Sequence, residues 1–409
     1  MQAFLKRGLS SLSLSASSSR SNLTTSTDNQ INDIPAETDD DEESSAETPV
    51  TFTTASEDVL FPKVRPELDG EECDRDCASC TIRYPAKFVV DLEDKLYGNV
   101  GGWATHVLIA TGKTDWVRDI ADEEGSVMEA VEKSGVKPAN GTLKLSASNM
   151  PVPDEYHMYP DGEQPTTALI LPAFTIVENV TPARAPDLIH QFVNKSATTT
   201  TPLDQPPLLS KPPTVDANLA ENTESGNRAP AIDGSNTERD DEVANATEIP
   251  TPLRSRPCPH AAVILLCSQR TRDARCGQSA PLLRREFERH LRPLGLYRDL
   301  HDERPGGVGI YFISHVGGHK YSANVMVYRR RDFEWYKKEA QKENEGEDGN
   351  RGDGVDGESE GAVQGIWLAR IRPEDCEGIV KYTVLKGKVV KPDTQLRGGF
   401  DRERGLISW

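Results

Sequence analysis

Residues 309–328 read GIYFISHVGGHKYSANVMVY, and residues 261–267, some forty positions upstream, read AAVILLC. Both stretches contain apolar, β-branched runs, which are typical of buried strands, and each run ends at a potential metal ligand. The later run ends at His315, which one valine and two glycines separate from His319. Adjacent glycines favour a tight turn over a helix. The sequence therefore predicts a sheet that presents Cys267, His315 and His319 at its strand ends.

A second cysteine, Cys276, follows Cys267 after eight intervening residues. Two thiolates and two imidazoles suit zinc or an iron–sulfur cluster, and do not suit calcium or magnesium. A zinc knuckle usually places two to four residues between its cysteines, so eight residues indicate a longer loop that arches over a two-iron cluster. Positive charge in this loop would offset the negative charge of such a cluster. It is carried by three arginines that only Asp273 opposes: Arg270, Arg272 and Arg275.

The composition limits the class of protein. The chain has 409 residues, of which 36% are hydrophobic and 6% aromatic, values low enough to predict extensive disorder beside two domains. The net charge of −19 argues against non-specific nucleic-acid binding. No apolar run is long enough to predict membrane insertion. Seven cysteines and no signal-peptide core indicate thiols or ligands in a reducing compartment.

Composition also divides the chain into segments. An N-terminal tail and a central Thr/Pro-rich stretch lack hydrophobic periodicity, so both predict disorder. The predicted organisation is a tail at 1–65, an α/β domain at 66–195, a linker at 196–257 and a second α/β domain at 258–409 with a disordered insertion near 337–362.

Hydrophobic patterns predict an alternation of strands and helices in both domains. In the first domain, strands are expected at 87–92, 105–112, 144–150 and 167–177, and helices at 116–133 and 184–193. In the second, strands are expected at 261–267, 307–315, 322–328 and 365–371, and helices at 280–293 and 373–387. The order β-α-β-β-β-α of the second domain fits a small thioredoxin-like sheet.

Three further cysteines, Cys73, Cys77 and Cys80, lie in the acidic stretch EECDRDCASCTIRYP. Cys77 and Cys80 form a C-x-x-C pair, which in a reducing compartment indicates a redox dithiol or half of a metal site. The flanking sequence is unlike that of a thioredoxin motif, where the pair opens a helix. Asp74 and Asp76 disfavour a thiolate nearby. A redox dithiol, buried structural cysteines and a minor metal site all remain open.

Three features of the second domain resemble the fungal sucrase/ferredoxin-like family: the strand with Cys267 and Cys276, SHVGGHKYSANVMVY, and EGIVKYTVLKGKVVKPDTQLRGGFD near the C-terminus. In the first domain, DCASCTIRYP and HVLIATGKTDW carry the same resemblance. The resemblance covers about 66–195 and 258–409. It implies a thioredoxin-like ferredoxin domain with a [2Fe–2S] cluster whose ligands are Cys267, Cys276, His315 and His319. It implies no site in the first domain. No paired-carboxylate site supports glycosidase chemistry, despite the family name.

Such a ligand set predicts an electron carrier with no substrate of its own. Two neutral imidazoles in place of thiolates make a cluster less negative and easier to reduce, and imidazole can couple reduction to protonation near neutral pH. The electron donor and acceptor are unknown. The alternatives are a thiol–disulfide redox enzyme that uses Cys77 and Cys80, and a zinc-stabilised interaction module.

The two chain ends indicate different compartments. Residues 1–27 are basic, Ser-rich and free of acidic residues, which is typical of a mitochondrial transit peptide. The last three residues, Ile407, Ser408 and Trp409, resemble the C-terminal tripeptide that client proteins present to the cytosolic iron–sulfur assembly targeting complex. The alternative for Trp409 is packing onto its own domain. We expect a cytoplasmic protein, with mitochondrial residence as the alternative.

Overall fold

Strand β7 (Ala262–Cys267) lies in the middle of the part of the sheet that carries the predicted ligands. It pairs in parallel with β9 (Val308–Ile313) and antiparallel with β10 (Val325–Arg329). Every residue of these three strands is buried. Burial on both faces explains why their sequences are continuous apolar runs and do not alternate with polar residues.

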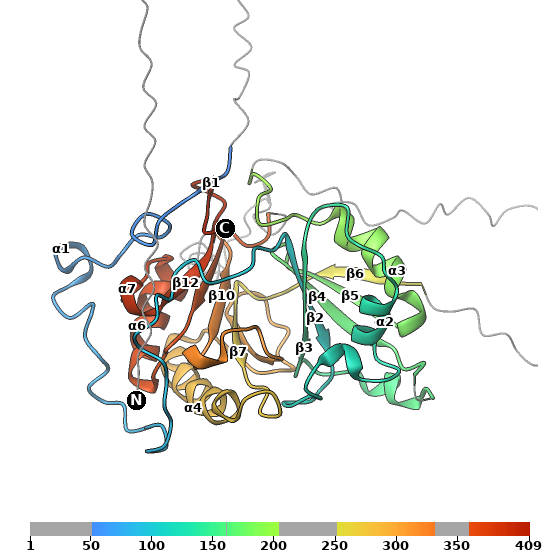
Figure 1. Ribbon diagram of the computed structural model, residues 1–409, viewed down its shortest axis with the longest axis horizontal. Coiled ribbons are helices and arrows are strands. Elements are labelled where there is room, and N and C mark those ends of the chain that lie inside the picture. Colours follow the sequence, from blue (N-terminus) through green and yellow to red (C-terminus); the bar gives the residue numbers. More distant parts are fainter. Residues whose placement is uncertain (1–50, 161, 204–251, 332–359) are drawn as a thin grey trace, which may run out of the picture. The chain divides into compact units, whose positions relative to one another are not determined.

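The computed structural model describes residues 51–160, 162–203, 252–331 and 360–409 (Figure 1). These residues belong to one unit, Val50–Trp409. The transit-like residues 1–27 and most of the predicted insertion lie outside the described residues.

The C-terminal half has the strand order expected of a thioredoxin-like sheet. Strand β11 (Gln364–Leu368) pairs antiparallel with β10, so the order is β11-β10-β7-β9. Helix α4 (Ala274–Leu291) connects the parallel strands β7 and β9. The predicted α/β class and its thioredoxin-like C-terminal half are therefore confirmed. The elements after β11 are α6 (Cys376–Gly378), a π-helical segment (Ile379–Val384), α7 (Pro392–Gln395), β12 (Leu396–Asp401) and β13 (Leu406–Ile407).

The N-terminal half repeats this topology. Its strand order is β3-β2-β4-β5, in which β2 is parallel to β3 and antiparallel to β4. Its elements are β2 (Thr105–Ala110), α2 (Val127–Lys133), β3 (Leu143–Ser148), β4 (Thr166–Leu171), β5 (Thr175–Val180) and α3 (Ala185–Asp187). Strands β3 and β9, the second of each half, pair antiparallel at Ser148 and Ile313 and join both halves into one sheet.

The joined sheet curls, so that its two halves face each other. His106 on β2 hydrogen-bonds Tyr328 on β10, although three strands separate β2 from β10 in the sheet order. One apolar core, which includes Trp103, Leu265 and Phe400, lies between the facing halves. Helices lie on the outer sides, where α2 and α3 flank one half and α6 and α7 the other (Figure 1). A second core packs under these helices.

Several predicted elements differ from the structure. Residues 87–92 form no strand, because Val89 and Leu92 are exposed and no neighbouring strand pairs with them. The predicted helix 116–133 is α-helical only at Val127–Lys133, after a 3-10 turn at Ile120–Asp122. Ser126 caps α2 by accepting a hydrogen bond from the Glu129 amide. The predicted strand 167–177 is a hairpin of β4 and β5 that turns at Pro172–Phe174.

Ordered structure extends beyond the segments that the sequence assigned to domains. Strand β1 (Thr53–Thr54) pairs in parallel with β13, and Leu60 and Phe61 are buried. Strand β6 (Arg254–Pro257), at the end of the predicted linker, pairs with β5. The division into two domains stays a prediction. The remaining short elements are α1 (Pro66–Asp69) and β8 (Tyr297–Arg298). Among the described residues, no helix is both long and apolar enough to cross a membrane.

Candidate metal centre

Cys267 and Cys276 meet at the end of β7. Cys267 is the last residue of the strand, Cys276 is the third residue of α4, and their sulfur atoms lie 3.4 Å apart. Both side chains are almost fully buried. The helix begins six residues earlier than predicted, because the Asp273 carboxylate caps it by accepting a hydrogen bond from the Arg275 amide. The expected eight-residue arch is therefore wrong: a shorter loop leads directly into the helix that carries Cys276.

The two thiols share a proton unequally. The Cys267 thiol donates to the Cys276 sulfur, and this bond, followed by His315 and Ser322, lowers the pKa of Cys276. The same bond and burial raise the pKa of Cys267. The first turn of a helix also favours a thiolate at Cys276. One thiolate and one thiol are thus held together, and a cation that binds them would displace the shared proton.

The two histidines follow β9 on a glycine turn. The Nδ1 atom of His315 lies 3.7 Å from the Cys267 sulfur, and the donor atoms of His315 and both cysteines lie within 4.8 Å of one another. The His319 ring is 5.5 Å from the His315 ring and is exposed, whereas His315 is half-buried. Gly318 adopts left-handed backbone angles that allow this turn. The structure therefore brings three predicted ligands together and places the fourth beside them.

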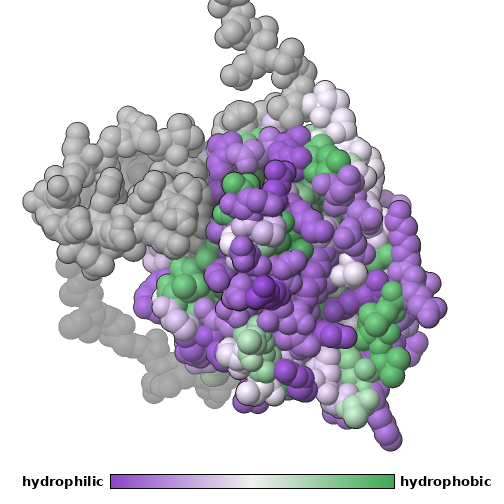
Figure 2. Space-filling view, turned by 90° about the vertical axis from the view of Figure 1, so that its left-hand side faces the viewer, coloured by the Kyte–Doolittle hydropathy of each residue, from purple (hydrophilic) through white to green (hydrophobic). Residues whose placement is uncertain are grey.

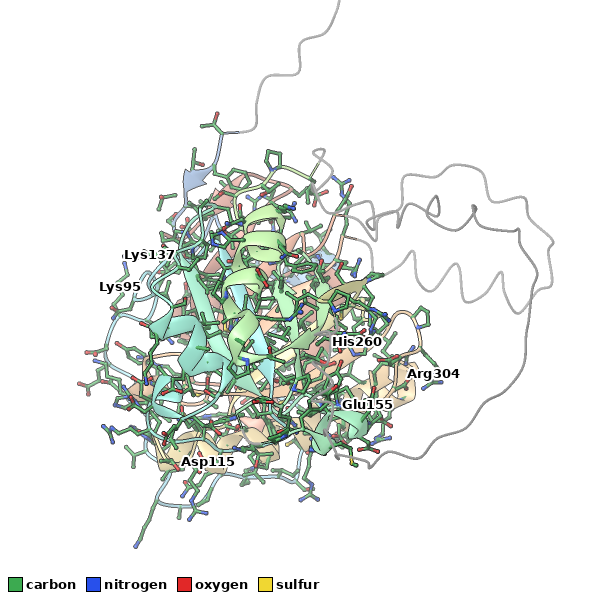
Figure 3. The ribbon with its side chains drawn as sticks, turned by 90° about the vertical axis from the view of Figure 1, so that its right-hand side faces the viewer. Lys95, Asp115, Lys137, Glu155, His260 and Arg304 are labelled. Atoms are coloured by element: carbon green, nitrogen blue, oxygen red, sulfur yellow. The ribbon has the colours of Figure 1, made fainter. Side chains whose placement is uncertain are left out.

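Residues of the N-terminal half hold the ligand loop, residues 268–273, which follows Cys267 and leads into α4. Gln269 accepts a hydrogen bond from the His315 amide at 2.8 Å and donates to backbone carbonyls that include that of Arg118. Asp115, labelled in Figure 3, accepts hydrogen bonds from the amide and the hydroxyl of Thr271. The orientation of the ligand loop thus depends on both halves, which the sequence did not indicate.

The positive charges near the site are only partly those that the sequence predicted. Arg275 makes a two-point ion pair with Asp273, which neutralises its charge, and Arg270 and Arg272 are exposed. Two cations that sequence reasoning missed, the half-buried Lys144 and the buried Arg397, lie near Cys267.

Arg397 is 2% exposed and donates to the Gly317 carbonyl and to Asn324. Lys144 extends from β3 over the Trp367 ring, with 4.6 Å between its nitrogen and the ring centre. Burial lowers the pKa of Lys144 to about 8 and that of Arg397 to about 10. No local motif marks these residues, because the fold brings them to the site from distant strands.

Cys73, Cys77 and Cys80 pack on the C-terminal half, although the sequence assigned them to the N-terminal domain. Cys77 contacts Arg289 and His290 at the end of α4. Cys73 packs with Tyr382 and Val390 in a small separate core. Cys77 and Cys80 therefore lie at the opposite end of α4 from Cys276.

The C-terminal residues pack onto the sheet. The Trp409 ring is half-buried against Trp103, with 4.5 Å between ring centres. Gly102 provides the space, since a Cβ atom there would lie 2.3 Å from the Trp409 ring. Thr54 donates a hydrogen bond to the Trp409 carbonyl, and Ser408 is buried. Trp409 therefore packs onto its own protein, which was the alternative inferred from the sequence. Recognition of the C-terminus by the iron–sulfur assembly targeting complex stays a prediction.

Comparison with known proteins agrees with this pattern of residues. The profile of the sucrase/ferredoxin-like family matches residues 96–398, which include all four predicted ligands. The chain belongs to this family. The resemblance inferred from the sequence is thereby confirmed.

Curated relatives of this family member match over shorter stretches. It is 52% identical to actin patches distal protein 1 of Saccharomyces cerevisiae over 69 residues, which are 17% of this chain and 22% of the yeast protein. It is 30% identical to altered inheritance of mitochondria protein 32 of Meyerozyma guilliermondii over 146 residues, 36% of this chain and 35% of the relative. The Clavispora lusitaniae protein of the same name is 29% identical over 132 residues, 32% of this chain and 33% of that protein. The matches thus span about a third or less of each relative. No solved structure matches the chain significantly.

Proposed function

We propose that this protein is an electron carrier that holds a [2Fe–2S] cluster through Cys267, Cys276, His315 and His319. The observation that supports it most is the convergence of two buried sulfurs and one imidazole within 4.8 Å, with a second imidazole beside them. This donor set is soft enough for iron–sulfur chemistry and fits a Rieske-like pattern of two thiolates and two imidazoles. The family name, sucrase/ferredoxin-like, points in the same direction.

The burial of the four side chains supports a role in electron transfer. Cys267 and Cys276 are held inside the protein, whereas His319 is exposed and His315 half-buried. A cluster bound there supplies a one-electron acceptor and donor. The imidazole edges would face a docked redox partner, and they can exchange protons with water when the charge of the site changes. Lys144 and Arg397 place positive charge on the side of the site that faces the protein interior, which favours the reduced form of a bound cluster.

Purification of the full-length protein from iron-replete cells tests this proposal. We expect a red-brown protein with sulfide-to-iron charge-transfer bands and about two irons and two acid-labile sulfides per chain, the composition of a [2Fe–2S] cluster. A colourless protein with one zinc per chain would instead support the zinc-stabilised module. Variants Cys267→Ser and Cys276→Ser should bind no iron, because serine replaces a thiolate poorly on iron.

We also propose cytoplasmic maturation through the C-terminal Ile407, Ser408 and Trp409. A terminal carboxylate beside an indole is a compact anchor for a pocket with one cation and one apolar slot. The names of relatives that refer to mitochondria, and the composition of residues 1–27, favour the mitochondrial alternative. The packing of Trp409 on Trp103 requires that the assembly complex bind before the C-terminus docks, or displace it.

Two truncations distinguish these compartments. We expect deletion of Trp409 to give folded protein with little iron in cells, and deletion of residues 1–27 to change neither iron content nor location. If the N-terminal truncation leaves the protein stranded in the cytosol while the Trp409 deletion keeps full iron loading, mitochondrial residence is the correct interpretation. Gly102→Ala, which displaces the Trp409 ring but keeps the tripeptide, is the control for lost packing.

A further inference from the structure

The C-x-x-C pair lies in a tight turn at the end of α4. The Cys80 amide donates a hydrogen bond to the Cys77 carbonyl at 3.3 Å, which closes a four-residue turn. A turn of this kind holds its first and last Cα atoms within about 7 Å, inside the range that a disulfide can bridge with little movement. The Cys77 amide also donates to the Glu374 carbonyl, which fixes the turn to the C-terminal half.

Cys77 lies beside three groups that favour a thiolate and one carboxylate, that of Glu377, that opposes it. Its sulfur lies 3.4 Å from a guanidinium nitrogen of Arg289, 3.4 Å from the Ser79 hydroxyl and 3.9 Å from His290 Nε2. Glu286, a carboxylate that is 2% exposed, holds Arg289 in place with a 2.7 Å ion pair. A thiol beside a fixed arginine and a histidine is a reactive nucleophile.

His290 is suited to accept the Cys77 proton. Burial, and then the neighbouring Arg289, lower the pKa of His290, so the imidazole is neutral near pH 7. A neutral imidazole beside a thiol can take up its proton when the sulfur attacks. The same Nε2 atom accepts a hydrogen bond from Arg289 at 3.0 Å, so it takes up the thiol proton when Arg289 turns toward the sulfur.

Cys80 has the opposite character. Its side chain is 3% exposed, and its thiol donates to the Ile82 carbonyl at 3.6 Å. Burial first, and then the Glu286 carboxylate, raise the pKa of Cys80. Both thiols are buried, at 7% and 3% exposed, but they differ in their charged neighbours, as stepwise exchange between a nucleophilic and a resolving thiol requires.

We propose that Cys77 and Cys80 form a second redox site, a dithiol that reduces small polar disulfides by exchange. The Cys77 thiolate attacks one sulfur of the substrate, forming a mixed disulfide and releasing the first substrate thiol. The Cys80 thiol then loses its proton and attacks the Cys77 sulfur, which forms the internal disulfide and releases the second thiol. Two electrons and two protons pass from the protein to the substrate. Two molecules of a different, more reducing small thiol then reduce the internal disulfide by the same exchange and are themselves oxidised to a disulfide, which restores the dithiol.

The surroundings favour a small, charged disulfide such as glutathione disulfide. Asp74, Arg75, Asp76 and Ser79 are exposed around the turn. The side of the molecule that carries α1 and this segment is largely hydrophilic, with separate smaller hydrophobic patches (Figure 2). Such a surface offers charged groups for a small polar substrate and little apolar area for an unfolded protein chain.

A metal site is the competing assignment for the same residues. Donor atoms of Cys77, His290 and Glu377 lie within 4.8 Å of one another. The Arg289 guanidinium, 3.4 Å from the sulfur, opposes a divalent cation there, because like charges repel at such a distance. The same charge stabilises a thiolate, so the exchange reaction fits the site better.

This site is independent of the proposed cluster. His290 follows Cys276 by fourteen residues on the same helix, which places the two sites on the order of 20 Å apart. The dithiol chemistry transfers two electrons and uses no ligand of the metal centre. Failure of either proposal therefore leaves the other standing.

Single-residue alkylation of the reduced full-length protein tests reactivity. With limiting iodoacetamide at pH 7 and peptide mass spectrometry, we expect Cys77 to react at least roughly tenfold faster than Cys73, because the Arg289 guanidinium beside Cys77 stabilises its thiolate. Cys73 is the control, since it lies four residues away, is buried like Cys77 (1% and 7% exposed) and packs with Val64, Tyr382 and Val390. Arg289→Gln should slow Cys77 alone. Equal rates at Cys77 and Cys73 would overturn the proposal.

A single-turnover reaction tests the exchange itself. Reduced protein mixed with glutathione disulfide should form an internal Cys77–Cys80 disulfide and release two glutathione thiols per chain. The Cys80→Ser variant should stop at the mixed disulfide, and Cys77→Ser should not react. The control variant Cys73→Ser should behave as wild type. Insulin tests whether the dithiol also reduces disulfides of proteins, and we expect little reaction with it. A reaction faster with insulin than with glutathione disulfide would refute the proposal that the substrates are small polar disulfides. No exchange with either, or one zinc per chain that Cys77→Ser removes, would overturn the dithiol site.

Discussion

The glycine turn between His315 and His319 offers a quantitative test of how the metal centre is built. Gly317 and Gly318 have positive φ angles of 86° and 66°. Alanine at either position costs about 1–2 kcal/mol of backbone strain. The two positions differ in their surroundings. A Cβ atom at Gly318 would lie 2.6 Å from a nitrogen of Arg397, whereas at Gly317 it would meet nothing within 4 Å.

Arg397 cannot move aside freely, because it is 2% exposed and donates hydrogen bonds to Gly317 and Asn324. Losing one such bond from a charged donor costs about 1.5–3 kcal/mol. We therefore expect Gly318→Ala to lower the free energy of unfolding by about 2.5–5 kcal/mol, and Gly317→Ala by only the backbone cost of about 1–2 kcal/mol.

Urea denaturation of the metal-free protein, followed by tryptophan fluorescence, measures both variants without a contribution from metal binding. Iron content after reconstitution provides a second measurement, and Gly318→Ala should retain less iron than Gly317→Ala. Equal destabilisation by the two substitutions, or a larger effect at Gly317, would refute the packing of Arg397 under the turn.

Three further predictions concern ligands, a buried cation and the second cysteine pair. His315→Cys or His319→Cys should retain a cluster but lower its reduction potential, because an anionic donor replaces a neutral one; an unchanged potential and pH dependence by protein-film voltammetry would exclude the ligand in question. The pKa of Lys144 is about 8 when folded and 10.5 ordinarily, so between these pH values the unfolded chain holds a proton that the folded protein has released. As the pH rises across this window, the free energy of unfolding of wild type, measured by urea titration, should therefore increase relative to that of Lys144→Met. If the free energies of both proteins change with pH in parallel, the amine of Lys144 is not buried. The double variant Cys77→Ser, Cys80→Ser should leave the iron content and the visible spectrum unchanged, since both cysteines lie at the far end of α4 from Cys276. Loss of iron in this variant would mean that the two sites are linked.

The ligands of the metal centre could be found from the sequence because each lies next to a recognisable strand. Cys267 and His315 end or follow continuous apolar runs, and the glycine pair before His319 marks a turn. The start of α4 was missed because Asp273 was interpreted as a charge opposing the arginines, whereas it is the residue that caps the helix. Lys144 and Arg397 could not be found, since the contacts that bring them to Cys267 join strands far apart in the chain.

The C-terminal half was predictable in order and class, whereas the N-terminal half was predictable only as α/β. The sequence does not show that this half repeats the thioredoxin-like strand order. Burial requires the strand residues to be apolar but does not determine which apolar residue stands at each position. Ala110, for example, ends β2 where Cys267 ends β7. Residues 87–92 alternate as a strand does, yet exposed Val89 and Leu92 show that alternation without a pairing partner forms no sheet.

Nitrogen ligation of the iron tests the central claim most directly. Full-length protein produced with ¹⁵N-labelled histidine, reduced with dithionite and measured by pulsed electron paramagnetic resonance should show two strongly coupled ¹⁵N nuclei. The signal of one should disappear in His315→Cys and that of the other in His319→Cys. A reduced protein with a resonance but no histidine coupling would contradict the ligand assignment, and a protein with no resonance and stoichiometric zinc would contradict the iron–sulfur function itself.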